Sequence, residues 1–295
     1  MAAPGSGRQL PWLLQALLAV SAAAGARAFL KLLLRFWTSG FRRKLKGGPK
    51  VQHMVLLWFP DLVEDSDDRR RFDEILEKMN TLPGIKASFQ KYGTKALDKE
   101  ALLQELGRPD VSHGATHCLY MVADDLPSLA TYLHGPVQTQ ELSPQLGKFL
   151  RHVHVMDTAL CMELAPSGEG ARDMLLQLVC LRFQPHVTRE SAVYRSFQEL
   201  ISEFGKHKGI RASLQHAGWG DLSKDQVVQQ LRWHDRTLGF SHVLGIAADS
   251  AADLRALLCS EVYARWLKTE APHLFNDGNP PVTIFHMPLE AERFA

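Results

Sequence analysis

The first 60 residues contain no aspartate or glutamate, although the chain has 295 residues and 32 acidic side chains. Nine of the 34 Lys and Arg residues lie there, which leaves 25 basic residues against all 32 acidic residues in the remainder. The folded part is therefore mildly acidic, even though the whole chain has a net charge of +2. This balance argues against the basic face that nucleic acids require, so no nucleic-acid partner is expected.

Clustered metal ligands and common catalytic motifs are also missing. The chain has only four cysteines, Cys118, Cys161, Cys180 and Cys259, and no C-x-x-C pair. Their spacing favours buried reduced thiols over a structural zinc site. His152 and His154 share a strand face, but no carboxylate or cysteine supplies a third ligand at a suitable spacing. A glycine-rich phosphate loop, a G-x-S-x-G elbow and an H-E-x-x-H helix are absent as well. We therefore expect no metal and no cofactor.

The N-terminal segment, residues 1–50, has the features of an anchor or a targeting signal. Residues 9–26 carry no charge, and eight Lys or Arg residues follow between Arg27 and Lys50. The uncharged run is just long enough to cross a bilayer. The basic residues after it favour an uncleaved anchor in residues 9–37, with the domains in the cytosol. Two alternatives stay open: a transit peptide for a mitochondrion or plastid, and a secretory signal cleaved near Ala26.

The remainder of the chain contains an internal repeat. Residues 53–59 (HMVLLWF) match residues 177–183 (QLVCLRF) at an offset of 124. Residues 84–90 match 209–215, and Thr116-His117 matches Ser241-His242, both at an offset of 125. Three landmarks in one order indicate two related domains, residues 51–163 and 174–290. Residues 164–173, rich in Gly, Pro and Ser, are the expected linker.

Each copy has the apolar pattern of strand, helix, strand, inserted segment, strand, helix and strand. The expected strands are 51–59, 85–92, 117–122 and 152–157, and then 177–183, 210–217, 242–247 and 282–287. Helical spacing of Phe72, Ile75, Leu76 and Met79 predicts the first helix. Ser250 should cap the second helix of the second copy, and Pro127 should lie in the first turn of its equivalent. The insertions 97–110 and 222–235 predict short amphipathic helices at the sheet edge.

A βαββαβ unit forms a four-stranded antiparallel sheet with both helices on one face. In the first strand His53 and Val55 point one way, whereas Met54 and Leu56 point the other way. Neither set suits contact with water, and helices can cover only one of them. The other face needs a partner, and the second copy is tethered beside it. We therefore expect an α+β protein of two ferredoxin-like repeats that pair into an intramolecular dimeric α/β barrel.

Several short motifs occur in a fixed order in the first copy. They are Val51–Phe59 (VQHMVLLWF), Pro83-Gly84-Ile85, Ala115-Thr116-His117, and Asp124-Asp125-Leu126 leading to Tyr132. Together they resemble the stress-response A/B barrel family, which includes the plant polyketide cyclase that forms olivetolic acid. The resemblance covers residues 51–160 well and 174–290 more loosely. It implies a ferredoxin-like fold, paired sheets and, in the catalytic members, a cavity between sheet and helices.

The resemblance also implies candidate site residues. In the cyclase, two histidines and a tyrosine carry out an aldol-type ring closure; the first-strand histidine matches His53 and the tyrosine matches Tyr132. Gln138 occupies the place of the other histidine, and a glutamine cannot take up a proton at neutral pH. His134, four residues earlier, could substitute for it. The second copy looks catalytically empty, because its equivalents are Gln177, Leu257 and Tyr263.

These observations support two main hypotheses. The first is a non-catalytic barrel tied to a membrane or organelle, with a stress-related, scaffolding or small-ligand-binding role. The second is a polyketide-cyclase-like enzyme that uses His53 with Tyr132 or His134; monooxygenase-type barrels acting on aromatic or haem substrates are a third possibility. A packed histidine is more often structural than catalytic, and the shared repeat position of His117 and His242 favours structure. The enzyme hypothesis gains if His53 and Tyr132 or His134 converge within hydrogen-bond reach on an open apolar pocket, and loses if Leu57, Phe59 and Phe89 fill that space.

Overall fold

The chain divides into two compact units, residues 1–47 and 48–295. The computed structural model describes residues 49–160 and 174–288, except 185, 220, 221, 233, 234, 236, 238 and 271–281. The expected N-terminal segment, the expected linker and Cys161 lie outside the described residues. Below, the first half means residues 49–160 and the second half means the described part of 174–288.

The described residues contain two antiparallel four-stranded sheets. The first consists of β1 (Val51–Leu57), β2 (Ile85–Lys91), β3 (His117–Ala123) and β4 (Val153–Ala159), in the order β2-β3-β1-β4. The second consists of β5 (Leu175–Leu181), β6 (Ile210–His216), β9 (His242–Ala248) and β10 (Val282–Pro288), in the order β10-β5-β9-β6. Read from β6, the second sheet repeats the order of the first. All eight expected strands are present, and the mixed α+β fold class is confirmed.

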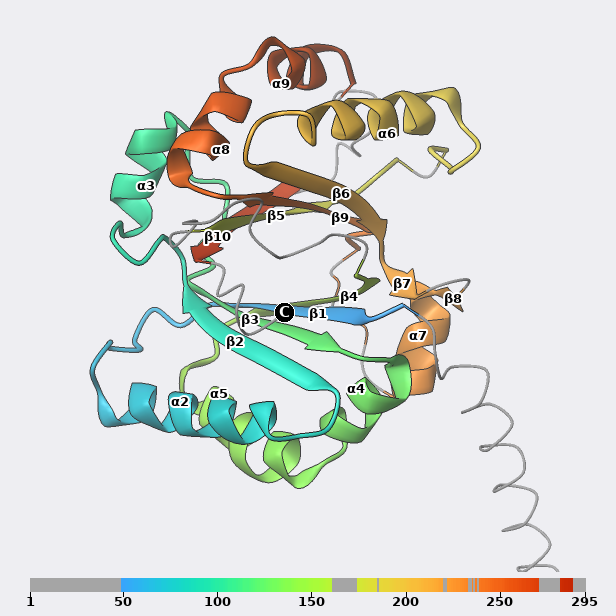
Figure 1. The fold of residues 1–295 in the computed structure, drawn as a ribbon. Coiled ribbons are helices and arrows are strands. Elements are labelled where there is room, and N and C mark those ends of the chain that lie inside the picture. Colours follow the sequence, from blue (N-terminus) through green and yellow to red (C-terminus); the bar gives the residue numbers. More distant parts are fainter. Residues whose placement is uncertain are drawn as a thin grey trace, which may run out of the picture. The chain divides into compact units, whose positions relative to one another are not determined.

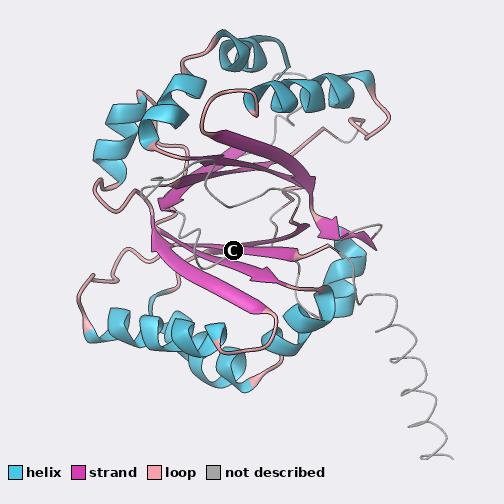
Figure 2. Ribbon diagram, in the orientation of Figure 1, coloured by secondary structure: helices cyan, strands magenta, loops and turns pink. Residues whose placement is uncertain are grey.

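Each sheet carries helices on one face (Figures 1 and 2). Those of the first half are α2 (Asp67–Asn80), α4 (Leu126–Leu133), the π-helix η1 (Val137–Leu142) and α5 (Ser143–Phe149). Those of the second half are α6 (Ala192–Phe204), α8 (Ala251–Leu258), α9 (Glu261–Arg265) and the π-helix η2 (Trp266–Glu270). The inserted segments fold as α3 (Lys99–Leu106) and α7 (Lys224–Leu231). A small hairpin of β7 (Gly218–Trp219) and β8 (Leu222–Ser223) precedes α7 and contacts it.

Local signals account for where most of these helices begin. Ser66 caps α2 by accepting a hydrogen bond from the Arg69 amide, and Pro127 lies in the first turn of α4 as expected. Ser250 caps α8 as expected: its hydroxyl accepts a hydrogen bond from the Asp253 amide and donates one to the Asp253 carboxylate over 2.6 Å. The sequence pattern missed η1 and α5, because it predicted only one helix between the third and fourth strands.

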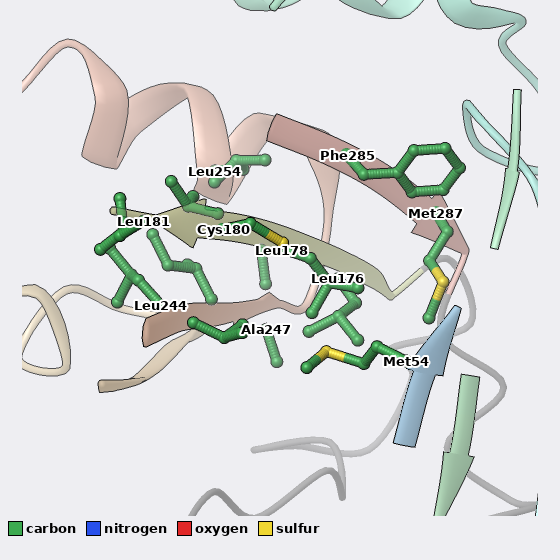
Figure 3. Close-up of a cluster of buried hydrophobic side chains, with 14 of the residues drawn as sticks. Met54, Leu176, Leu178, Cys180, Leu181, Leu244, Ala247, Leu254, Phe285 and Met287 are labelled. Atoms are coloured by element: carbon green, nitrogen blue, oxygen red, sulfur yellow. The ribbon is translucent and has the colours of Figure 1, made fainter. Parts of the chain in front are cut away.

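Both faces of β1 are buried, as its apolar sequence predicts. The Met54 and Leu56 side chains belong to a hydrophobic cluster that also contains Leu176 and Ala247 of the second sheet. Figure 3 shows Met54 reaching the apolar side chains of that sheet. His53 and Val55, which alternate with them, face the helices α4 and α5.

Polar contacts also join residues of the two sheets at their edges. The Thr158 hydroxyl of β4 donates a hydrogen bond of 2.6 Å to the Gln215 side chain of β6. At the opposite edge, the Gly93 amide after β2 donates to the His286 carbonyl of β10 over 3.0 Å. The described halves therefore contact each other through an apolar layer and at two strand edges.

Candidate functional site

The first half contains a cavity of about 260 Å³ between its sheet and its helices. Aliphatic side chains from both layers form most of its wall, namely Val55, Leu119, Leu133, Leu142, Leu146, Leu150, Val153 and Val155. The polar side chains of the wall are those of His53, Tyr132, Gln138 and Ser143. Ser143 and Gly147 are exposed, so the cavity reaches the surface beside α5. No lysine, arginine, aspartate or glutamate is among the lining residues.

His53 forms the main polar feature of the cavity. It is 3% exposed, and Asp157 lies directly opposite it on β4. The His53 Nδ1 atom is 2.7 Å from the Asp157 carboxylate. An ionised carboxylate only accepts hydrogen bonds, so Nδ1 carries the proton and Nε2 is left as an acceptor. An acidic partner on one ring nitrogen is how proteins orient a histidine that acts through the other.

Tyr132 and two neighbouring side chains form a hydrogen-bonded chain along the cavity wall. The Tyr132 hydroxyl donates to the Gln138 side-chain oxygen over 2.5 Å, and the Gln138 amide donates to the Ser143 hydroxyl over 3.2 Å. Gln138 lies in η1, and such π-helical turns often occur at functional sites. Burial raises the pKa of Tyr132, so its hydroxyl stays protonated at neutral pH. The hydroxyl can therefore donate a hydrogen bond but does not serve as a base.

Of the three candidate site residues, two line the cavity and one does not. His53 and Tyr132 both line it, from β1 and α4. The His134 side chain instead donates from Nε2 to the Leu231 carbonyl of the second half over 2.7 Å. Leu57, Phe59 and Phe89 are not among the residues that line the cavity. His53 and Tyr132 therefore line one cavity, whereas the His134 side chain is bonded outside it.

The corresponding region of the second half is built differently. Gln177 replaces His53, and the residue opposite it is His286, whose Nε2 atom is 3.0 Å from the Gln177 oxygen. The Tyr92 hydroxyl of the first half is 2.7 Å from the other ring nitrogen, Nδ1. Burial lowers the pKa of His286 to about 3, so the ring is neutral at pH 7. Each nitrogen of His286 has a protein partner, so neither is left for a ligand.

Aromatic rings pack together in the helix layer of the second half. The Trp266 ring centroid lies 5.0 Å from that of Tyr263 and 6.0 Å from that of Phe197, and all three side chains are buried. Tyr263 stands at the repeat position of Gln138. The second half thus places an aromatic ring where the first half has a polar cavity residue.

His117 and His242 share one polar contact and are both stacked on a phenylalanine ring. The Nδ1 atom of each lies 2.9 Å from the hydroxyl of the preceding residue, Thr116 or Ser241. The His117 ring stacks on Phe89, and the His242 ring stacks on Phe183. Burial lowers the pKa of His117 to about 4 and that of His242 to about 3. The hydroxyl contact at Nδ1 is common to both histidines, whereas Phe89 and Phe183 lie at different positions of the two halves, and His117 also contacts Glu64. The shared contact fits the structural role that the sequence predicts for both.

Two other features bear on the sequence expectations. Within the described part of the chain, no three His, Cys, Asp or Glu side chains form a group that could hold a metal ion. The His154 ring packs 4.8 Å from the Trp58 ring, not beside a third ligand. Every helix among the described residues is too short or too polar to cross a membrane. Residues 9–37, which carry the anchor prediction, lie outside that range.

The sequence reasoning missed Asp157 and Ser143. Asp157 carried a weak signal, because it is the only acidic residue of β4 and shares a strand face with the apolar residues Val153 and Val155. Ser143 carried none, since its place in the wall depends on the π-helical turn before α5. Together the polar side chains can orient an oxygen-bearing ligand in an aliphatic cavity, with one imidazole nitrogen available as a base.

Comparisons with known proteins support the fold. No protein-family model matches the chain, and no curated protein matches it. A candidate monooxygenase from Fusobacterium nucleatum has 6% identity and a TM-score of 0.52, covering 82% of this chain and 93% of that chain. A candidate monooxygenase from Lactobacillus acidophilus has 8% identity and a TM-score of 0.45, covering 81% and 93%. A chlorite dismutase from Candidatus Nitrospira defluvii has 14% identity and a TM-score of 0.43, covering 86% and 98%. The first likeness shows the fold alone, a mixed α+β arrangement like that of ferredoxin-like dimeric α/β barrel proteins.

Proposed function

We propose that this chain is a small-molecule-binding barrel whose ligand site is the cavity of the first half. The observation that carries the proposal is the buried His53–Asp157 pair beside a cavity of about 260 Å³ with aliphatic walls. Ligand sites in proteins are commonly apolar cavities with a few fixed polar groups. The second half then serves as the structural partner of the binding half.

We propose that the architecture behind this function is a tandem pair of ferredoxin-like domains, residues 51–163 and 174–290, with residues 164–173 as the linker. We propose that they pair within the chain as a closed dimeric α/β barrel and belong to the stress-response A/B barrel family. The shared strand order and the hydrogen bonds at two strand edges support this pairing. So does the hydrophobic cluster that contains side chains of both sheets.

The wall of the cavity indicates the chemistry of the ligand. No charged side chain is among the lining residues, so the cavity cannot offset the free-energy cost of removing an ionic ligand from water. A neutral ligand is therefore preferred. Eight aliphatic side chains require a mostly apolar body. The Nε2 acceptor of His53 requires a hydrogen-bond donor, such as a hydroxyl group, at the sheet end of the ligand.

The test compares two probes of the same shape, 2-naphthol and 2-methylnaphthalene. The full chain in lipid nanodiscs is titrated by calorimetry, and a Leu146→Trp variant, whose indole fills the cavity, gives the baseline for partition into lipid. His53→Asn keeps an amide to donate to Asp157 but removes the Nε2 acceptor. We expect saturable 2-naphthol binding in the wild type, and a preference over 2-methylnaphthalene of about 3- to 10-fold that His53→Asn abolishes. Equal binding by wild type and Leu146→Trp would refute the site.

A second candidate function is acid–base catalysis, and the 2.7 Å contact between His53 and Asp157 favours it. In a polyketide-cyclase-like reaction, His53 Nε2 would take a proton from an activated carbon between two carbonyl groups. The carbanion would attack a second carbonyl of the same chain, and the new alkoxide would receive a proton from the imidazolium. Tyr132 would have to release its hydrogen bond to Gln138 in order to donate one to that oxygen. His53→Asn should abolish turnover of a synthetic poly-β-ketone, whereas unchanged turnover would exclude the reaction.

We also propose that residues 9–37 attach the protein to a membrane, with the domains in the cytosol. A cleaved transit peptide for a mitochondrion or plastid is the alternative. The proposal rests on the uncharged run of residues 9–26 and the eight basic residues after it. Mass spectrometry of the mature N-terminus distinguishes the two, because an intact Met1 or Ala2 supports the anchor and a shortened N-terminus supports a cleaved peptide. A start directly after Ala26 would instead indicate a secretory signal.

A further inference from the structure

The two inserted helices each contact the other half of the chain. Figure 1 shows α3 of the first half beside α8 of the second, and α7 of the second half beside α4 of the first. Because α3 and α7 occupy the same repeat position, and α4 and α8 do too, the two contacts are reciprocal. The contact between α7 and α4 lies next to the cavity wall, because Tyr132 and Leu133 of α4 line the cavity.

A single side-chain hydrogen bond fixes the end of α7 to the end of α4. His134 is the C-cap residue of α4, and its Nε2 atom donates to the carbonyl of Leu231, the last residue of α7, over 2.7 Å. Carbonyl groups in the last turn of a helix have no partner within the helix. His134 supplies that partner from the other half, and Leu231 is fully buried beneath the contact.

The contact lies at the junction between two parts of the cavity wall. Tyr132 and Leu133 precede His134, and Gln138 and Leu142 of η1 follow it. The chain turns tightly there, with the Gly135 amide bonded to the Tyr132 carbonyl over 2.9 Å. Movement of His134 would therefore displace the Tyr132–Gln138 hydrogen bond and the aliphatic wall together.

We propose that His134 is a positioning residue, through which α7 of the second half holds the α4–η1 wall of the cavity in its binding geometry. The inference rests on the proposed ligand-binding function for its consequence, but its structural part can be tested alone. It assigns the second half a direct part in the ligand site of the first. It also gives His134 a role that differs from a substitute base.

The reciprocal contact provides an internal control. At the other end of the molecule, Arg108 after α3 donates to the carbonyl of Leu258, the last residue of α8, over 2.5 Å. Its guanidinium group also lies 5.0 Å from the centre of the Tyr263 ring. Cys259 stands where the first half has His134. Arg108 thus holds the aromatic side of the second half and does not touch the cavity wall.

The experiment measures amide hydrogen exchange and probe binding in the full chain in lipid nanodiscs. The variants are His134→Ala, His134→Gln and Arg108→Ala; glutamine retains an amide donor near the position of Nε2. We expect His134→Ala to raise exchange in residues 126–142 and to weaken 2-naphthol binding, each by about fivefold, the effect of one lost hydrogen bond. His134→Gln should restore both. Arg108→Ala should raise exchange only in residues 251–265.

The outcomes separate this inference from the proposed function. Unchanged exchange in residues 126–142 of His134→Ala would overturn the contact as a positioning device. Raised exchange with unchanged probe affinity would overturn its influence on the site. If the wild type binds no probe while the exchange pattern appears as expected, the proposed ligand fails and the positioning of the wall by His134 stands.

Discussion

The helix layers of the two halves differ more than their sheets do. Both sheets have the same strand order, and the buried histidines His117 and His242 have equivalent partners. In the first half, however, aliphatic side chains leave a cavity of about 260 Å³ beside His53. In the second half, Phe197, Tyr263 and Trp266 pack against one another. A common backbone plan therefore supports either a ligand site or a packed core, depending on the side chains beneath the helices.

The residues that pair the first strand of each sheet with its last strand differ in the same sense. His53 and Asp157 leave one imidazole nitrogen facing the cavity, whereas both nitrogens of His286 have partners, Gln177 and Tyr92. The histidine of the pair lies on the first strand of the sheet in the first half, and on the last strand of the sheet in the second half. A buried histidine with both nitrogens bonded stabilises the fold, and one with a free nitrogen can act on a ligand.

The largest expected effect comes from removing an aromatic ring of the second half. Trp266→Ala should lower the free energy of unfolding by about 3–5 kcal/mol, because the side chain is 2% exposed and the packed rings cannot close the space. Leu146→Ala, on the cavity wall of the first half, should cost less than about 1 kcal/mol, since that side chain already borders open space. Urea unfolding followed by circular dichroism measures both. Equal losses would show that the two helix layers are packed alike.

Acidification should destabilise the protein through its buried neutral histidines. Burial lowers the pKa of His286 from 6.5 to about 3, and that of His117 to about 4. Below pH 6.5 the unfolded chain binds protons at these rings that the folded chain does not, so the free energy of unfolding decreases as pH falls toward 4. Thermal unfolding between pH 7 and pH 4 should show a steady fall in Tm.

His286→Gln tests the share of the second half in this dependence. It removes one titrating ring, so its Tm should fall less steeply with acidification than that of the wild type, although it starts lower at pH 7 because the Tyr92 bond is lost. The matched control is His186→Gln at an exposed position, which should keep the wild-type slope. A wild-type slope in His286→Gln would mean that the His286 ring takes up its proton without cost to the fold.

The smallest effect is expected from converting the polar pair of the first half into that of the second. The double substitution His53→Gln with Asp157→His places a glutamine on β1 and a histidine on β4, as in β5 and β10. It should preserve the fold, because a glutamine and a histidine at these strand positions bond each other in the second half, although Ala217 supplies no counterpart to the Tyr92 hydroxyl that also bonds His286. It should also remove the preference for 2-naphthol, a loss of about 1 kcal/mol in relative affinity. A retained preference, measured by calorimetry beside each single variant, would mean that the hydroxyl group is recognised elsewhere.

Much of the fold followed from the sequence because strand and helix periodicity are local properties. The eight strands, α2, α6 and the two inserted helices were each indicated by the spacing of apolar residues such as Phe72 and Ile75. The π-helix η1 and α5 were missed, since a π-helical turn has no distinct apolar period. His53 and Tyr132 were named through family resemblance, whereas the partner Asp157 needed the strand register.

The sequence alone determined the eight strands, the apolar nature of both faces of β1, and the histidine at position 53. Only the tertiary structure decided that His53 meets Asp157, that a cavity remains beside them, and that His134 bonds Leu231. The reason is that the apolar period of a strand or helix can be read from residues that are close together in the chain. A cavity, or a hydrogen bond across the molecule, depends instead on how separate elements pack. Alternation of side chains specifies which face is apolar, and packing specifies what that face encloses.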